Sequence, residues 1–342
     1  MLKAIKVRLY LTTQQQEALA KSFGCARWYY NYALNACIQH YENTGKSLPL
    51  KAYKGLLPQL KVEHPWLKED CYSAVLQCVA INLNKAYNNF FNGRAKFPRF
   101  KSKHHKQSIQ YPQNVKVAGD YLDIPKIGIV KAVFHRPIEG KLKTVTISKT
   151  PTDKYFASIL CEVEAEPGQS PGDKTLGVDL GLKDFAIVHD GEQVIKYANP
   201  KHLKRHEKNL ARKQKKLARK IKALASFAAG DQRQAFAASG NSRNKFKKLV
   251  ARVHEKVSNA RQDFLHKLSS ARKQSRRLPP ACNCCGRLVD ESQVIVVENL
   301  NVKGLVRNRK LSKSISDVGW GMFVNRLQAF PPFNGGKHCC KR

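Results

Sequence analysis

Two apolar segments of this chain each carry a carboxylate, and this feature constrains the fold more than any other. The first is Gly-Val-Asp-Leu-Gly at 177–181, and the second runs from Val294 to Glu298. A charge on a buried strand is costly unless a cation or hydrogen bonds satisfy it. The glycines around Asp179 leave room for a backbone or a phosphate to approach. We therefore expect two neighbouring strands whose acids lie side by side.

Paired carboxylates on neighbouring strands have a known chemistry. Carboxylate oxygen is the ligand that hard Mg²⁺ or Mn²⁺ prefers. In nucleases built this way, two ions about 4 Å apart activate water and stabilise the leaving oxygen. Asp179 and Glu298 are therefore the predicted catalytic residues and metal ligands. For Asp179 taken alone, a capped or salt-bridged acid at a strand end is the alternative.

The charge balance indicates a polyanionic partner. The chain has 62 Lys and Arg against 25 Asp and Glu, a formal net charge of +37 on 342 residues. Lysine and arginine that neutralise phosphates release condensed counterions, so RNA or DNA is the simplest partner. A generally solvated basic surface is the alternative. A hydrophobic content of 42% supports a folded core and two or three domains.

Nothing in the sequence predicts secretion or a membrane partner. The first ten residues alternate apolar and basic side chains like a strand, which is not the pattern of a signal peptide. No segment has the roughly 20 apolar residues that span a bilayer. We expect a cytoplasmic protein, in which Cys25, Cys37, Cys71, Cys78 and Cys161 are buried thiols.

The N-terminal half predicts a sheet interrupted by helices. Residues 2–10 resemble a strand, and Thr12 or Thr13 can cap the helix that follows. Helices are expected over 14–41 and 73–91, within a helical region at 11–104. Residues 105–168 return to short β-like runs, which together with 2–10 predict a small barrel or sandwich. The basic hinge between these regions places Arg99, Lys101 and Lys103 as candidate nucleic-acid contacts.

A further domain is expected over residues 172–342, with a helical insertion at 200–268. Asn199 can cap a helix that begins near Pro200. A second helical stretch at 244–268 predicts an antiparallel hairpin joined through 226–241.

The first helix of this hairpin is strongly basic. Between Lys201 and Lys222 there are eleven Lys or Arg and one acid, Glu207, while leucine recurs every seventh residue. Such like charges repel each other unless phosphate is present, so we expect nucleic-acid contact, with a solvated helix face as the alternative. The expected contacts are Lys204, Arg205, Lys208, Arg212, Lys215, Lys216, Arg219 and Lys220.

Four motifs resemble the TnpB family of transposon-encoded proteins, which are often labelled transposases and are related to type V CRISPR effectors. They lie at 97–101, 177–186, 296–304 and 307–320, and the resemblance runs from about residue 1 to 327. It implies a multidomain α+β protein: a wedge-type β-barrel with an inserted helical recognition lobe, then an RNase H-like RuvC α/β domain. It also implies an RNA-guided DNA endonuclease that binds guide RNA from the transposon end and target DNA. Asp179 and Glu298 match the first two RuvC acids, which use Mg²⁺ or Mn²⁺.

The chain departs from the family's pattern after Glu298. The family has a third acid on a C-terminal helix and a four-cysteine zinc ribbon, and neither is found here. Asp317 is the one later acid and is expected to cap or complement a helix start. Residues 271–287 and the tail from about 328 have the composition of sequence read out of frame, so we hypothesise a truncated or decayed copy. Free thiols are expected, and zinc is not, at Cys282, Cys284, Cys285, Cys339 and Cys340.

The sequence therefore predicts a TnpB-like, RNA-guided DNA-binding protein whose cleavage is impaired by the loss of a metal ligand. One alternative is an active endonuclease that uses Asp317 or another ligand. A second is a nuclease-dead repressor or competitor for transposon RNA. A strand-joining transposase is a weaker alternative, because no Tyr or His-hydrophobic-His motif for that chemistry is found.

Overall fold

The computed structural model describes residues 2–164, 174–227, 233–269, 292–328 and 339–341. It divides the chain into two compact units, residues 1–165 (unit 1) and 166–342 (unit 2), each of which is described by itself. In the described ranges, no helix combines the length and apolar character needed to cross a membrane.

Unit 1 contains a curled antiparallel sheet of seven strands in the order β2-β6-β7-β1-β5-β4-β3. Strand β1 lies in the middle and pairs with β7 and β5, and its side chains alternate so that Val7 and Leu9 are buried. The strands are β1 (Leu2–Tyr10), β2 (Gln107–Tyr111), β3 (Lys116–Ala118), β4 (Tyr121–Ile124), β5 (Gly128–Val133), β6 (Lys141–Lys149) and β7 (Tyr155–Glu162).

The expected small barrel is formed in part, as a curled half-barrel. Strands β2 and β3 are the two edges of the sheet, and no pairing joins them in the described part of unit 1. Closure requires the edge strands to meet in a consistent stagger. Here the three-residue β3 pairs only with β4, so the sheet stays open as a half-barrel.

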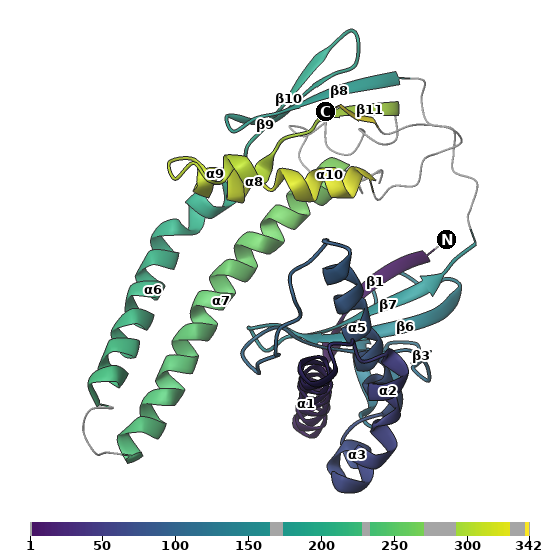
Figure 1. Ribbon diagram of the computed structural model, residues 1–342. Helices are drawn as coiled ribbons and strands as arrows, with labels where there is room; N and C mark the ends of the chain where they lie inside the picture. The colour runs from purple at the N-terminus through teal and green to yellow at the C-terminus, as the bar shows by residue number, and fades with distance from the viewer. Residues whose placement is uncertain (1, 165–173, 228–232, 270–291, 329–338, 342) are drawn as a thin grey trace. The chain divides into compact units, whose positions relative to one another are not determined.

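Five helices connect β1 to β2 and share one hydrophobic core with the sheet. They are α1 (Thr13–Thr44), α2 (Leu50–Gly55), α3 (Leu57–Glu63), α4 (Trp66–Glu69) and α5 (Ser73–Phe91). In Figure 1, α1 and α5 lie against the sheet and α2 and α3 lie beyond it. All five cysteines that the sequence predicted to be buried thiols are buried and free, and four of them, Cys25, Cys37, Cys71 and Cys161, belong to this core.

The first turn of α1 confirms the predicted cap. The Thr12 side chain accepts a hydrogen bond from the Gln15 N–H, and the Gln15 side chain accepts one from the Thr12 N–H. This reciprocal capping box satisfies two donors that a helix start would otherwise leave free. The helix ends at Gly45, whose positive φ of 65° is a conformation that glycine adopts without strain.

Unit 2 contains a mixed sheet of five strands in the order β10-β9-β8-β11-β12. Its strands are β8 (Lys174–Leu180), β9 (Asp184–His189), β10 (Val194–Ala198), β11 (Ser292–Glu298) and β12 (Cys339–Lys341). β11 runs parallel to both β8 and β12, while β9 pairs antiparallel with β8 and β10.

The helices of unit 2 pack on one face of this sheet. They are α6 (His202–Phe227), α7 (Arg233–Ser269), α8 (Val302–Leu305), α9 (Ser312–Val318) and α10 (Trp320–Gln328). Buried side chains from the ends of α7, α9 and α10 form a core with Val178 and Val297 of the sheet. Phe185 anchors it through edge contacts to Phe264 and Phe323, with ring centroids 5.1 and 5.3 Å apart.

The expected helical hairpin forms, with two corrections. α6 and α7 lie alongside each other over their length (Figure 1). α7 already begins at Arg233, so much of the expected connection at 226–241 is helical. Asn199 does not cap α6: its side chain accepts from the Lys201 N–H, and the helix begins at His202. Lys201 has a positive φ of 48°, and this turn places Asn199 outside the capping position.

We expect Thr12→Ala to lower the stability of unit 1 by about 1 kcal/mol, because it removes one half of the capping box. Chemical denaturation followed by circular dichroism measures this change. Thr13→Ala, a substitution at the next residue that leaves the box intact, is the control. Equal stabilities for the two variants would show that the box contributes nothing.

Candidate functional site

Asp179 and Glu298 lie at neighbouring positions on the parallel strands β8 and β11. The last registered pair is Val178 with Val297, and each acid is the next residue along its strand. Neighbouring strands are about 4.8 Å apart, and paired residues point to the same face. The structure thus brings together the two acids that the sequence predicted, although their catalytic role stays a prediction.

Both carboxylates are on the face of the sheet opposite the helices. Val178, Leu180 and Val297 are buried in the core, whereas Asp179 and Glu298 are exposed. Period-two alternation along each strand produces this division. The acids therefore avoid the cost of burial and stay accessible to an ion or a phosphate.

The residues around the acids keep this part of the sheet open. Gly177 has only the His189 carbonyl oxygen near the position of a side chain, at 3.9 Å. Gly181 is constrained by the β8–β9 turn, where an added Cβ would lie 2.8 Å from the Asp184 carbonyl oxygen. The turn that follows Asp179 thus explains Gly181. The open space beside Asp179 explains Gly177.

The two carboxylates fit one hard cation with water in its remaining positions. Neither forms an ion pair or a side-chain hydrogen bond with another described residue, so both are available as ligands. Mg²⁺ is often held by one or two carboxylates and several waters. Across the described ranges, no group of three or more His, Cys, Asp or Glu side chains gathers as a metal site.

Asp317 is a structural residue that connects three helices. One carboxylate oxygen accepts from the Leu203 N–H at 2.8 Å, and the other forms an ion pair with Arg261 Nη2, also at 2.8 Å. Arg261 Nε donates to the Asp317 carbonyl oxygen as well. The sequence suggested that Asp317 caps the start of its own helix. In the structure it lies near the end of α9 and caps the N-terminus of α6 instead.

The turn after Asp317 depends on glycine. Gly319 ends α9 with a φ of +78°, and an added Cβ would lie 3.0 Å from the Arg261 side chain and 2.8 Å from Met322. The arginine can therefore cross this turn only where no side chain is present. Arg261 was not among the residues predicted from the sequence, where its one signal is a basic residue on the apolar end of α7.

His202 begins α6 beside this network. Its ring lies 6.0 Å from that of Phe264, and Nε2 is buried without a hydrogen-bond partner in the described part of the chain. Burial lowers the pKa of His202, and Arg205 and Arg261 lower it further, while Asp317 acts in the opposite direction.

The basic residues predicted on α6 form an exposed surface. None of the eight is in an ion pair with another residue that the structure describes, and all of them are exposed. They are Lys204, Arg205, Lys208, Arg212, Lys215, Lys216, Arg219 and Lys220. Glu207, the acid of this stretch, is paired with Lys313 of α9. Leu210 of the same helix is buried.

The basic hinge of unit 1 is held in a defined position. The Asn31 side chain binds both the N–H and the carbonyl oxygen of Lys101, at 2.7 and 3.0 Å. The Lys101 amine lies 3.9 Å from the centre of the Tyr30 ring, and burial lowers its pKa. Arg99 and Lys103 are exposed.

The structure does not test the expectation of free thiols at the cysteines of the C-terminal region. Cys282, Cys284 and Cys285 lie outside the described residues. Cys339 and Cys340 belong to β12, where they pair with Val296 and Val297.

Fold and site together define a strongly basic α+β protein with two carboxylates at neighbouring positions of the parallel strands β8 and β11. Family models match residues 158–272, described as "Probable transposase", and residues 1–46, described as "Helix-turn-helix domain". Over residues 2–46 the structure forms one strand and one long helix. The chain belongs to the IS605 OrfB/TnpB family.

Two relatives cover most of the chain. A protein of Streptomyces pristinaespiralis described as "Putative RNA-guided DNA endonuclease" is 31% identical, over 95% of this chain and 74% of its own length. InsQ of Escherichia coli (strain K12), with the same description, is 28% identical over 98% of this chain and 79% of its own.

Solved structures give a weaker comparison. A Cas12f1–sgRNA–target DNA complex has a TM-score of 0.30 at 10% identity, and the match covers 96% of this chain and 83% of that one. A CRISPR-Cas12f ternary complex has a TM-score of 0.34, also at 10% identity, with 92% and 69% covered. These scores are too low to bear on the fold or on the function.

We expect Asp317→Ala to destabilise unit 2 by about 3–5 kcal/mol, because it removes the carboxylate that pairs with the Arg261 guanidinium and caps α6. Thermal and chemical unfolding measure this loss. Asp263→Ala is the matched control, since it removes an exposed acid that pairs with Lys267 four residues along the same helix. A similar small loss in both variants would contradict the role of Asp317.

We expect His202 to make unit 2 less stable in mild acid. Its folded pKa is below the usual 6.5, so the unfolded chain takes up a proton first as the pH falls. The stability is therefore complete above about pH 6.5 and decreases as the pH falls below that value. Unfolding between pH 7.5 and 5 should show a weaker pH dependence in His202→Gln than in the parent chain. His206→Gln, a change one turn along α6, should leave the dependence as it was.

Proposed function

We propose that this chain binds a guide RNA and target DNA, and that Asp179 and Glu298 hold a divalent cation at a nuclease centre of reduced activity. The observation that carries this proposal is the parallel register of β8 and β11, which brings Asp179 and Glu298 to neighbouring positions. Family membership and the relatives' descriptions support it.

The exposed cations of α6 support the nucleic-acid part of the proposal. Eight exposed positive charges on one helix repel each other, and phosphate relieves that repulsion while it releases counterions. The net charge of +37 adds long-range attraction for any polyanion. Binding should therefore be strong at low salt and should weaken steeply as salt is added.

The carboxylate pair supports the nuclease part. A cation held there would polarise a phosphodiester and activate a bound water. The chain contributes the position of the two carboxylates. They lie on an open face, where the backbone of a nucleic acid can approach Gly177. Asp179 and Glu298 each come at the end of a strand anchored in the core, so their positions are rigid.

The structural contacts of Asp317 support the reduced activity in this proposal. By resemblance, the family's reaction uses three acids, and Asp317 is held by Arg261 and the Leu203 N–H. Moving it to a metal would leave the guanidinium unpaired and α6 uncapped, at a cost of several kcal/mol. Two ligands should bind a metal more weakly than three, while the dispersed basic surface is unaffected.

The decisive experiment is purification from cells, followed by sequencing of any co-purified RNA and an assay with DNA matching that RNA. We expect a defined RNA to be retained at low salt and DNA cleavage in Mg²⁺ or Mn²⁺ to be slow. Asp179→Ala and Glu298→Ala should each abolish this cleavage and weaken Mn²⁺ binding at least about tenfold by calorimetry, with RNA retention unchanged. Glu192→Gln, which removes an exposed acid of the β9–β10 turn, is the control.

Three results would contradict parts of the proposal. Absence of any co-purified RNA would contradict the guide-RNA function. Rapid cleavage would show that two carboxylates suffice or that another ligand takes part. Unchanged Mn²⁺ affinity in both alanine variants would contradict metal binding by Asp179 and Glu298.

A further inference from the structure

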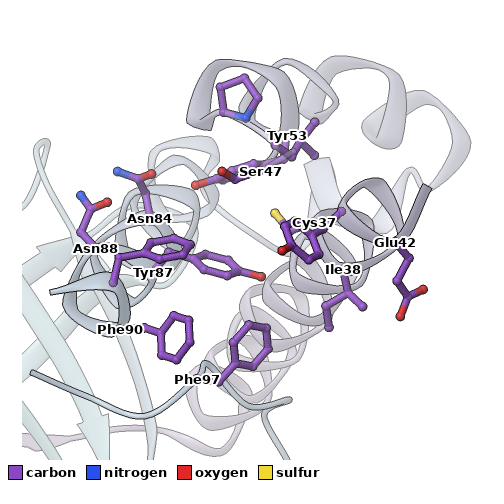
Figure 2. A pocket seen from close by; sticks show the side chains of 14 residues that line it. Cys37, Ile38, Glu42, Ser47, Tyr53, Asn84, Tyr87, Asn88, Phe90 and Phe97 are labelled. Atoms are coloured by element: carbon purple, nitrogen blue, oxygen red, sulfur yellow. The ribbon is translucent and has the colours of Figure 1, made fainter. Parts of the chain in front are cut away.

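Unit 1 contains a pocket whose lining differs from the basic surfaces described above. It has a volume of about 570 Å³ and lies among α1, α2, α5 and the segment that follows α5. Figure 2 shows Asn84 and Asn88 on one side of it, Phe90 and Phe97 on another, and Tyr53 across from the phenyl rings. A pocket of this size accommodates a small planar molecule.

The walls of the pocket are aromatic and partly open to solvent. Phe97 meets Phe90 and Tyr87 edge-on, with ring centroids 5.3 and 5.7 Å apart, and Phe91 stacks on Tyr87. Phe97 is 44% exposed and Phe91 is 65% exposed. Large rings exposed around a hollow are costly to hydrate and offer flat faces on which another ring can stack.

The position of Phe97 is determined by the hinge. The two hydrogen bonds from the Asn31 side chain to the Lys101 backbone hold the segment 97–101 against α1, and Pro98 of this segment is buried. The aromatic wall is therefore present before any ligand binds, which reduces the entropic cost of binding.

Polar groups with unused hydrogen-bonding capacity also line the pocket. The Tyr53 hydroxyl is buried and has no partner in the described part of the chain. Leaving a buried hydroxyl unpaired costs about 1–3 kcal/mol, so a ligand that reaches it is favoured. Asn84 and Asn88, one helical turn apart on α5, make no side-chain hydrogen bond with a described residue, and each offers donors and an acceptor.

The charge around the pocket selects the ligand further. Between Asp70 and Asp120 the sequence has no acid and eight Lys or Arg, and this stretch supplies α5 and the hinge. Glu42 is the one acid of the lining, on α1. The surroundings therefore favour an anion, whereas the pocket itself favours a flat ring with donors and acceptors along its edge.

We infer that this pocket receives one unpaired nucleobase of a bound single strand. A base has two π-faces for the phenyl rings and a polar edge for the amides, the Tyr53 hydroxyl and Glu42. Its phosphates stay outside, where the basic hinge can neutralise them. The inference rests on the proposed nucleic-acid function and adds a base-recognition site in unit 1. RNA and DNA strands present the same chemistry to it.

The test uses the full chain and fluorescently labelled 12-nucleotide single strands of mixed sequence, as RNA and as DNA. Each strand is also made with every base replaced by an abasic spacer. We expect Phe97→Ala to weaken binding of the intact strand at least about fivefold, the effect of losing one stacked base. Affinity for the abasic strand should be unchanged, because the phosphates remain. Tyr53→Phe, which retains the ring, should show a smaller loss of the same kind, and the RNA and DNA arms show which strand supplies the base.

Tyr121→Ala, a change at an exposed aromatic on β4, is the control. It should bind all strands like the parent chain. Equal affinities of the parent and Phe97→Ala for intact strands would overturn the pocket inference while leaving the nucleic-acid function in place. An equal loss on intact and abasic strands would also overturn it, since the effect would then not involve a base. No binding of any strand at low salt would overturn the proposed function itself.

Discussion

The parallel pairing of β8 with β11 is the constraint on which unit 2 depends. It joins two segments more than a hundred residues apart and fixes which residues of each meet. One face of the pair is bound by the ends of α7, α9 and α10, and the other face carries Asp179 and Glu298. A shift of one residue in either strand would bury one acid and expose a core valine, so the core and the carboxylate pair depend on the same register.

The Asp317 network joins the helical hairpin to α9, whose buried side chains Ile315 and Val318 belong to the core of unit 2. α6 is strongly basic and has little apolar surface of its own, so its N-terminus is fixed by a carboxylate from α9 and by Arg261 from α7. The same contacts occupy both carboxylate oxygens of Asp317. The structure therefore commits Asp317 to the stability of the hairpin.

Local patterns predicted much of the fold. The strand at 2–10, the helix at 73–91 and the Thr12 cap follow from alternation, helical periodicity and capping chemistry within a few residues, and the structure confirms them. The Asn199 cap was wrong because its competitor, Asp317, is distant in the sequence. The open half-barrel differs from the expected barrel because closure depends on whether two edge strands meet, which no local pattern encodes.

What the sequence by itself determined is the charge, the family and the two acids at strand ends, since each is a matter of residue identity and short-range order. The tertiary structure alone decided that Asp179 and Glu298 are neighbours, that Asp317 belongs to Arg261, and that Tyr53, Asn84 and Phe97 line one pocket. The physical reason is that these relations join residues remote along the chain. They are set by strand register and by the packing of whole elements on a core, where many small contacts act together.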